Sequence, residues 1–234
     1  MNYTHTEPNG QLAFSDTRYT FLSIPSQLEG FNNSHTVLHR SMSGREVFCF
    51  NGTLDIEEAD RVCPICGSRM HINGHRNLTL RHLCFGGNLS AVSFDRVQFV
   101  CKCGHSHMQK VPFKAEGHQI STELYQYTRD LLALGTYTLK QVAEITGLGK
   151  NTVKDIDLKR LKELYTIDGT TLIKPEHPVK MLAIDEFKLH NGYRYATHII
   201  DLDTGHILWI SHGKKKQVVY DFIDHVGMEW MSTV

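Results

Sequence analysis

Four of the six cysteines stand in two close pairs, and thiolate pairs at such spacing bind metal ions. Cys63 and Cys66 are separated by two residues, which lets both sulfurs reach one ion, and the following Gly67 relieves the tight backbone behind them. Cys101 and Cys103 follow after a stretch long enough for a small sheet. The spacing predicts a closed tetrahedral site of four sulfurs for a structural Zn2+, whose binding supplies folding energy.

The second cysteine pair leaves one alternative open. It has a single intervening residue, and two histidines follow closely, so a site of three cysteines with His105 in place of Cys103 is the other candidate. Cys49 and Cys84 have no companion nearby in the sequence, and we expect both to pack as small hydrophobic residues. Disulfides are not expected, because the N-terminus carries no secretion signal.

A second candidate site centres on an acid. Residues 181–184 form an apolar run that predicts a buried strand, and this run ends in Asp185 and Glu186. Burying a carboxylate is costly unless it is paired, and a metal ion is the usual partner of an acid at a strand end facing a cleft. Asp185 is therefore a candidate ligand of a hard divalent cation. Two further strands and a helix are predicted at 194–202, 206–211 and 217–226. Three hairpin-linked strands followed by a helix are how a ribonuclease-H-like core begins.

The phrase AIDEFKLHNGYRYATHIIDLDTGHIL resembles the start of the catalytic domain of bacterial DDE-class insertion-sequence transposases. The resemblance is to the ISL-type subgroup, which carries an N-terminal zinc-binding domain and a central helix-turn-helix, and it extends to the cysteine pairs. It implies that Asp185 is the first of three acids that hold Mg2+ or Mn2+ for DNA cleavage and strand transfer. The other two would lie on a following strand and a much later helix. The resemblance therefore predicts a truncated copy that performs no strand transfer alone.

Between the two candidate sites the sequence predicts helices that bind DNA. A helix over 121–134 precedes a short helix capped by Thr138, a turn at Gly147 plugged by Leu148, and a second helix starting near Lys150. The inward positions expected on the two helices of the turn are Val142, Ala143, Ile145, Val153, Ile156 and Leu161. The outward positions, which lie where such a helix reaches base edges in the major groove, are Lys150, Asn151, Thr152, Lys154 and Asp155, and the first four are the expected DNA contacts. The alternative is a helix pair that uses the same pattern only for packing.

The formal net charge of zero hides an uneven distribution. Residues 1–60 hold 3 Lys and Arg against 8 Asp and Glu, whereas residues 61–115 hold 8 against 1. Electrostatic fields act over only about 8 Å at physiological salt. A binding partner therefore responds to the local charge of a segment rather than to the net charge of the whole chain. Of the basic residues in this segment, we expect Arg76 and Arg81 to contact DNA phosphates. The alternative is that the segment is a solvated basic surface without a DNA partner.

The fold class expected is α+β with several domains: a small zinc-bound β-rich domain, a helix-turn-helix, and the first β-β-β-α part of a ribonuclease-H-like fold. The boundaries expected are a poorly ordered lead-in at 1–45, the zinc-binding domain at 46–115, the helix-turn-helix at 116–165, a linker at 166–178, and the catalytic part at 179–234. Within 46–60 we expect two strands joined by a turn at Asn51 and Gly52.

The function expected is a transposase that binds the terminal inverted repeats of an insertion sequence. The alternative is a zinc-stabilised helix-turn-helix protein that represses by occupying the element ends without catalysis. The partner is double-stranded DNA in both cases, and a homo-oligomer on the DNA is left open. No run approaches the roughly 20 apolar residues that cross a bilayer, so we expect no membrane contact and a cytoplasmic protein.

Overall fold

The computed structural model describes residues 14–20, 24, 27–41, 44–175, 177, 179–189 and 194–234. The chain is α+β and divides into two compact units, Met1–Arg160 and Leu161–Val234. No helix in the described part of the chain is long and apolar enough to cross a membrane. The first unit contains β1 (Phe14–Thr20), β2 (Phe31–Ser41), β3 (Glu46–Leu54), the 3-10 helix η1 (Glu58–Arg61), β4 (His71–Phe85), β5 (Asn88–Val100), β6 (Ser106–Met108), α1 (Thr122–Ala133), α2 (Leu139–Thr146) and most of α3 (Lys150–Tyr165). The second contains β7 (Leu182–Lys188), β8 (Tyr195–Asp201), β9 (Ile207–His212), α4 (Lys216–Val226) and α5 (Met228–Met231).

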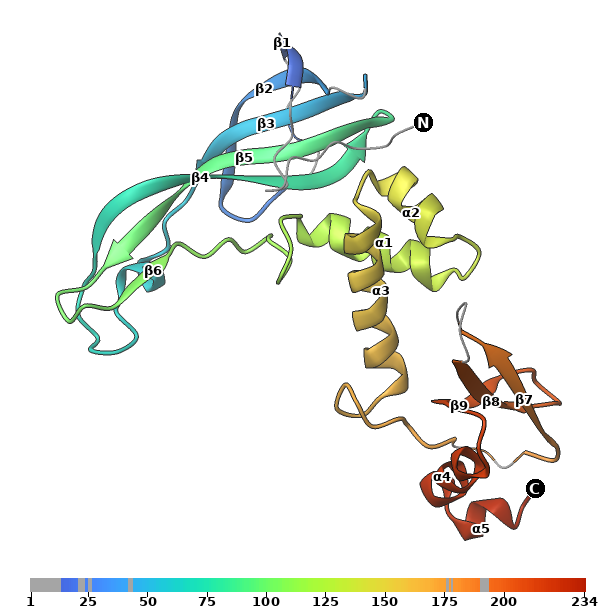
Figure 1. Ribbon diagram of the computed structural model, residues 1–234. Helices are drawn as coiled ribbons and strands as arrows, with labels where there is room; N and C mark the ends of the chain where they lie inside the picture. Colours follow the sequence, from blue (N-terminus) through green and yellow to red (C-terminus); the bar gives the residue numbers. More distant parts are fainter. Residues whose placement is uncertain are drawn as a thin grey trace. The chain divides into compact units, whose positions relative to one another are not determined.

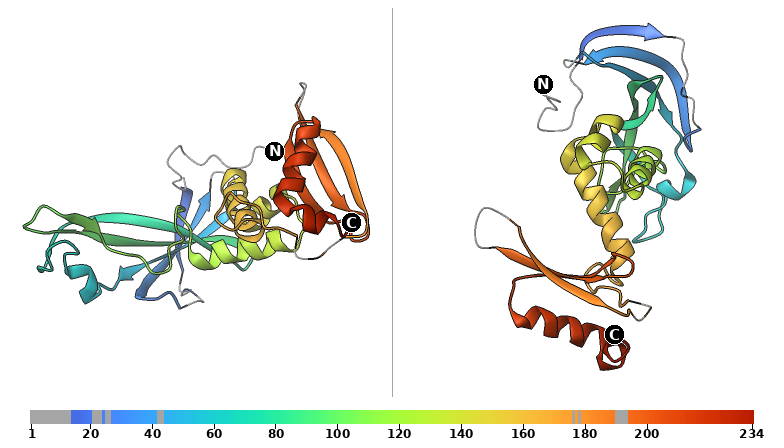
Figure 2. Two further views of the ribbon diagram at one scale, coloured as in Figure 1. Left: turned by 90° about the horizontal axis from the view of Figure 1, so that it is seen from below. Right: turned by 90° about the vertical axis from the view of Figure 1, so that its right-hand side faces the viewer.

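One sheet organises the first unit, in the order β1-β2-β3-β5-β4 with β6 added to β5 (Figure 1). Its pairs are antiparallel except β3 with β5, which run parallel. The parallel pairing uses only the first half of β5, from Leu89 to Asp95. Beyond that point β4 and β5 continue as a narrow ribbon, which ends at β6 and the cysteine loops (Figure 2).

The sheet begins earlier in the chain than the sequence indicated. The lead-in expected over 1–45 contains β2, which pairs with β3 from Phe31 opposite Leu54 to Arg40 opposite Glu46. Residues 1–13 lie outside the described residues. Polar composition was a poor guide for β2 because its polar side chains bond within the sheet: the side-chain Nδ2 of Asn33 donates to the Asn51 carbonyl at 2.9 Å. The expectation of a poorly ordered segment is therefore wrong for β2.

The turn expected at Asn51 and Gly52 is also wrong, because β3 runs through both residues. Gly52 is needed there for close packing: a Cβ at this position would lie 2.2 Å from the Asn32 carbonyl oxygen and 2.7 Å from the ring of Phe31. The Phe31 ring itself packs against Phe94. An Asn-Gly pair favours a hairpin turn in isolation, but here the glycine makes room for an aromatic ring on the neighbouring strand.

The three helices form their own core, made of Leu124, Leu131, Leu132, Val142, Leu148, Val153 and Ile156 with Ala115 and Ile120. Ser121 caps α1 by accepting from the Leu124 amide, and Thr138 caps α2 in a capping box with Gln141. Of the inward positions expected, Val142, Val153 and Ile156 are fully buried, whereas Ile145 is 37% exposed. Thr146 is buried instead, with its hydroxyl bonded to the Val142 carbonyl at 2.7 Å.

The second unit is a three-stranded antiparallel sheet in the order β7-β8-β9, followed by α4 and α5. The expected succession of three strands and a helix is present. Helix α4 packs against the sheet through Phe222 and Val226, which meet Ile199 at the centre of β8. Asp201 at the end of β8 accepts from the Asp203 amide and the Thr204 hydroxyl, which closes the turn to β9.

Candidate metal site and nucleic-acid interface

The four paired cysteines come together at the far end of the β4–β5 ribbon. Their sulfurs all lie within 4.8 Å of one another, with Cys63 3.6 Å from Cys103 and Cys66 3.5 Å from Cys101. Four sulfurs at about 2.3 Å from a tetrahedral zinc ion are about 3.8 Å apart, so these side chains fit one metal ion. Cys103 is in the cluster and His105 is not, although both were candidates.

Two short loops shape this cluster. In the first, the Gly67 amide donates to the Cys63 carbonyl at 2.9 Å, and Gly67 has a left-handed φ of 69°. In the second, the Gly104 amide donates to the Cys101 carbonyl at 3.0 Å. Hydrogen bonds from the Ser68 hydroxyl and backbone amide lower the pKa of the Cys66 thiol to about 6, which favours the thiolate that a metal needs.

The remaining two cysteines do not join this cluster. Cys49 is buried in β3, as expected for a small hydrophobic residue, and burial raises its pKa to about 11. Cys84 is half-buried at the end of β4, where its thiol donates to the Ile145 carbonyl at 3.6 Å. Cys84 therefore connects the sheet with α2.

Most basic side chains of the 61–115 segment already have partners inside the protein. Arg69 lies 3.7 Å from Glu58, and both Nε and Nη2 of Arg96 donate to the Gln109 carbonyl. Lys114 donates to the Ala115 carbonyl at 3.2 Å. Arg76 is exposed on β4, directly opposite Arg96 on β5. The uneven charge along the sequence is thus partly neutralised, because the acidic 46–60 segment folds beside the basic one.

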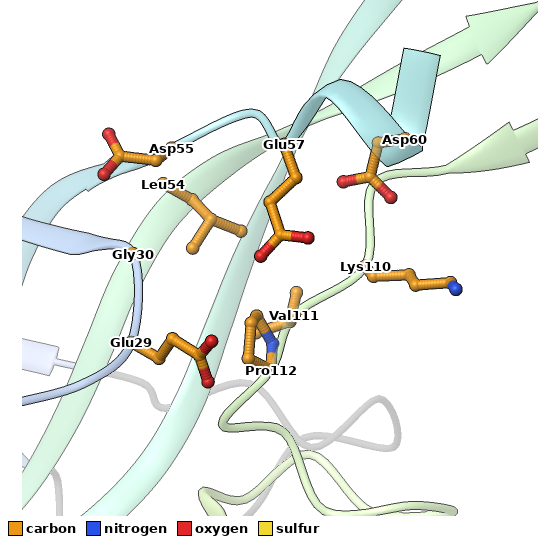
Figure 3. Close-up of a pocket in the computed structure, with 9 residues that line it drawn as sticks. All are labelled: Glu29, Gly30, Leu54, Asp55, Glu57, Asp60, Lys110, Val111 and Pro112. Atoms are coloured by element: carbon orange, nitrogen blue, oxygen red, sulfur yellow. The ribbon is translucent and has the colours of Figure 1, made fainter. Parts of the chain in front are cut away.

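A pocket of about 650 Å³ opens between the β2–β3 side of the sheet and the segment after β6. Figure 3 shows the carboxylates of Glu29, Glu57 and Asp60 turned toward the same space in front of Val111 and Pro112. The charged lining is acidic except for Lys110, which disfavours a phosphate backbone in this pocket. Its acids are also too dispersed to form a metal-binding group among the described residues.

Helices α2 and α3 have the geometry that the sequence predicted for a tight connection. Gly147 follows α2 with a left-handed φ of 68°, Leu148 is buried, and α3 starts at Lys150. Of the five residues expected to face outward, Thr152 is half-buried and the others are exposed: Lys150, Asn151, Lys154 and Asp155. The first turn of α3 therefore presents two lysines and an amide to solvent.

Asp185 stands in the middle of β7 and not at its end, which corrects the expected position. The strand continues to Lys188, and Asp185 is opposite His198 of β8. Its side chain is exposed and accepts from the Glu186 amide at 2.8 Å. The run before it is not buried either, because Ile184 is 52% exposed. No second acid joins Asp185 in a metal-binding group within the described residues.

Two comparisons relate the chain to known proteins. Residues 182–234 match the ISL3-type family described as transposase. Over 126 residues the chain is 28% identical to the transposase for insertion sequence element IS1001 of Bordetella parapertussis. The comparisons support an insertion-sequence transposase of the ISL3 type. The alignment covers 53% of this chain and 29% of that transposase, and no solved structure matches.

One of the two arginines predicted to contact phosphate has a different environment. Arg81 Nη2 donates a hydrogen bond to the Gly147 carbonyl at 2.6 Å, and burial lowers the pKa of the guanidinium. No local sequence signal could have predicted this bond, because the two residues are 66 positions apart. Arg81 is thus a contact between the sheet and the α2–α3 turn.

Proposed function

We propose that this chain is the part of an ISL3-type transposase that binds the ends of its insertion sequence, with α1, α2 and α3 acting as a helix-turn-helix. The observation that carries the proposal is the first turn of α3. It leaves the left-handed Gly147 turn with Lys150, Asn151 and Lys154 exposed, and such a turn can enter the major groove. The match of residues 182–234 to a transposase family supports the same assignment.

In this proposal the four cysteines hold a structural Zn2+. The support is the donor set, four sulfurs at mutual distances that a tetrahedral zinc ion requires. Because all four positions are filled by protein, the ion would have no open position for a substrate. It would fix the loops at 63–67 and 101–105, which are too short to build a core.

In the second unit we propose the start of a ribonuclease-H-like fold, with Asp185 as one ligand of Mg2+ or Mn2+ in the complete enzyme. When bound, such ions activate the attacking oxygen and stabilise the leaving one. The Asp185 side chain is exposed, so a metal ion in solution can reach its carboxylate. A single described carboxylate does not make this site, so no cleavage step is assigned to these residues.

DNA binding is tested by fluorescence anisotropy with two duplexes, one from the DNA that flanks the coding sequence and one of mixed sequence. We expect tighter binding to the flanking duplex, and we expect Lys150→Ala with Lys154→Ala to weaken it by about 1–3 kcal/mol. Lys162→Ala, on the last turn of the same helix, is the control and should bind like the wild type. Equal binding by all three proteins would remove α3 from the interface.

A second candidate function is repression by occupying the element ends without catalysis. The observation in its favour is that no described acid joins Asp185 in a metal-binding group. Mg2+-dependent nicking of the flanking duplex by the wild type and by Asp185→Ala separates the two. Nicking by the wild type alone supports catalysis, whereas unchanged DNA binding with no nicking by either protein supports repression.

A further inference from the structure

The end of α2 is capped by side chains of the sheet. A helix leaves its last carbonyls without partners in the helix, and they must find donors elsewhere. Here the Gly147 carbonyl accepts from Arg81, and the Cys84 thiol lies 3.6 Å from the Ile145 carbonyl and 4.0 Å from that of Thr146. Residues from one short piece of β4 thus serve three successive carbonyls at the α2–α3 turn.

The same turn is also packed tightly onto the sheet. A Cβ at Gly147 would lie 2.3 Å from Cδ2 of Leu89 and 2.9 Å from Nη2 of Arg81. Leu89 is buried and begins the part of β5 that pairs with β3. Figure 1 shows the β4–β5 end of the sheet beside α2. The turn has no space to shift toward the sheet, and its carbonyl is held from that side.

The start of α1 is attached to the same piece of β4. The Ser121 amide donates to the Arg81 carbonyl at 2.8 Å, and the Arg81 amide donates to the Gln119 carbonyl at 3.1 Å. His82 Nδ1 lies 2.8 Å from the hydroxyl of Ser121, which caps α1. Residues 81–84 therefore hold both the first turn of α1 and the last turn of α2.

We propose that Arg81 is a positioning residue for DNA binding, which fixes the α2–α3 turn to the sheet so that the sheet and the first turn of α3 meet DNA as one rigid piece. The inference rests on the proposed role of α3. It assigns Arg81 an indirect effect through the Gly147 carbonyl, in place of the direct phosphate contact that its charge suggests.

Salt dependence distinguishes these two roles. The logarithm of affinity falls linearly with the logarithm of salt concentration, and each phosphate contact adds about 0.9 to the steepness of that fall. Arg81→Gln should weaken binding to the flanking duplex roughly tenfold, as expected for loss of a charged hydrogen bond, and leave the slope unchanged. Arg76→Gln, exposed on the same strand, is the matched control: as a phosphate contact it should lower the slope by about 0.9 on both duplexes.

Hydrogen exchange without DNA supplies a readout that does not depend on the proposed function. In Arg81→Gln we expect faster exchange at residues 147–153 and unchanged exchange in β2 and β3, and Arg81→Lys, which keeps one donor, should restore much of the protection. If Arg81→Gln fails to fold, Arg81→Lys carries the comparison with the wild type.

Two results would overturn the inference. If Arg81→Gln reduced the salt-dependence slope by about 0.9, the value of one phosphate contact, and left hydrogen-exchange protection at 147–153 unchanged, Arg81 would be a direct DNA contact. Wild-type affinity and protection in Arg81→Gln would leave it no role. If the wild type binds neither duplex, the proposed function fails, whereas the exchange measurement still decides whether Arg81 holds the turn.

Discussion

At the residue scale, the cysteine cluster shows how far spacing alone can lead. The two pairs lie 35 to 40 residues apart across the cluster, and their sulfurs still converge to within 4.8 Å. The doubt between Cys103 and His105 could not be decided from the sequence, because both follow Cys101 closely. The structure brings Cys103 and not His105 to the other three sulfurs: the Cys101 amide bonds to the His105 carbonyl, which closes the loop with Cys103 in the cluster.

We predict that Cys101→Ser loses the bound metal and lowers the free energy of unfolding by about 3 kcal/mol or more, because metal binding contributes folding energy to the loops. Elemental analysis should give one zinc per chain in the wild type and none in the variant, and urea unfolding measures the stability. Cys84→Ala is the control, since Cys84 lies outside the cluster, and should keep its zinc. A full zinc complement in Cys101→Ser would contradict the site.

His82 gives the protein a dependence on pH. Burial lowers its pKa below the ordinary 6.5, with Glu123 opposing the shift. The native ring therefore stays neutral to lower pH than the ring of the unfolded chain, which takes up a proton below about pH 6.5, so this contribution to stability is full above that pH and declines below it. His82→Asn should be less stable at neutral pH and lose less on acidification. Urea midpoints at about pH 7.5 and about pH 5.5 measure this, and equal losses in both proteins would exclude His82 as the cause.

At the element scale, the helices obey local rules, and the strands depend on distant neighbours. The capping box of α2 and the left-handed Gly147 could be read from short motifs. The strand character of β2 and the continuity of β3 through Gly52 could not, because both depend on pairing with each other and on the Phe31 ring. Of the two arginines predicted as phosphate contacts, Arg81 instead bonds to the Gly147 carbonyl of a distant segment, and Arg76 stays exposed.

We predict that Gly147→Ala destabilises the protein by roughly 2–4 kcal/mol, from a left-handed backbone with a side chain and from overpacking against Leu89. Gly135→Ala is the matched control: its φ is 67°, and a Cβ there meets nothing within 4 Å, so only the backbone cost of about 1–2 kcal/mol remains. Thermal unfolding measures both. Equal losses would mean that the sheet does not press on the turn.

At the scale of the whole molecule, the first unit places its two candidate sites at opposite ends of β4 and β5. The cysteine loops lie next to the start of β4 and the end of β5. Gly147 contacts Arg81 and Leu89, which lie near the end of β4 and the start of β5. The 13 residues of β5, at about 3.3 Å each, separate them by roughly 40 Å. The cysteine cluster therefore lies about the length of β5 away from the α2–α3 turn.

Removal of the metal should consequently act locally. With a chelator we expect faster hydrogen exchange at 62–75 and 96–108 and unchanged exchange in α1, α2 and the start of α3, because their core contains no residue of the cysteine loops. Cys101→Ser without chelator should give the same pattern. Loss of protection in α2 on chelation would show that the ion stabilises the whole unit.

The sequence by itself determined the features that depend on neighbours a few residues away: the cysteine loops, the helix caps, the glycine turn and the order of three strands and a helix. Only the tertiary structure decided which strands join the sheet, that Arg81 holds the Gly147 carbonyl, and that Asp185 lies mid-strand and exposed. The physical reason is range: a local motif carries its own hydrogen bonds, whereas a side chain's partner and burial are set by segments that only folding brings together.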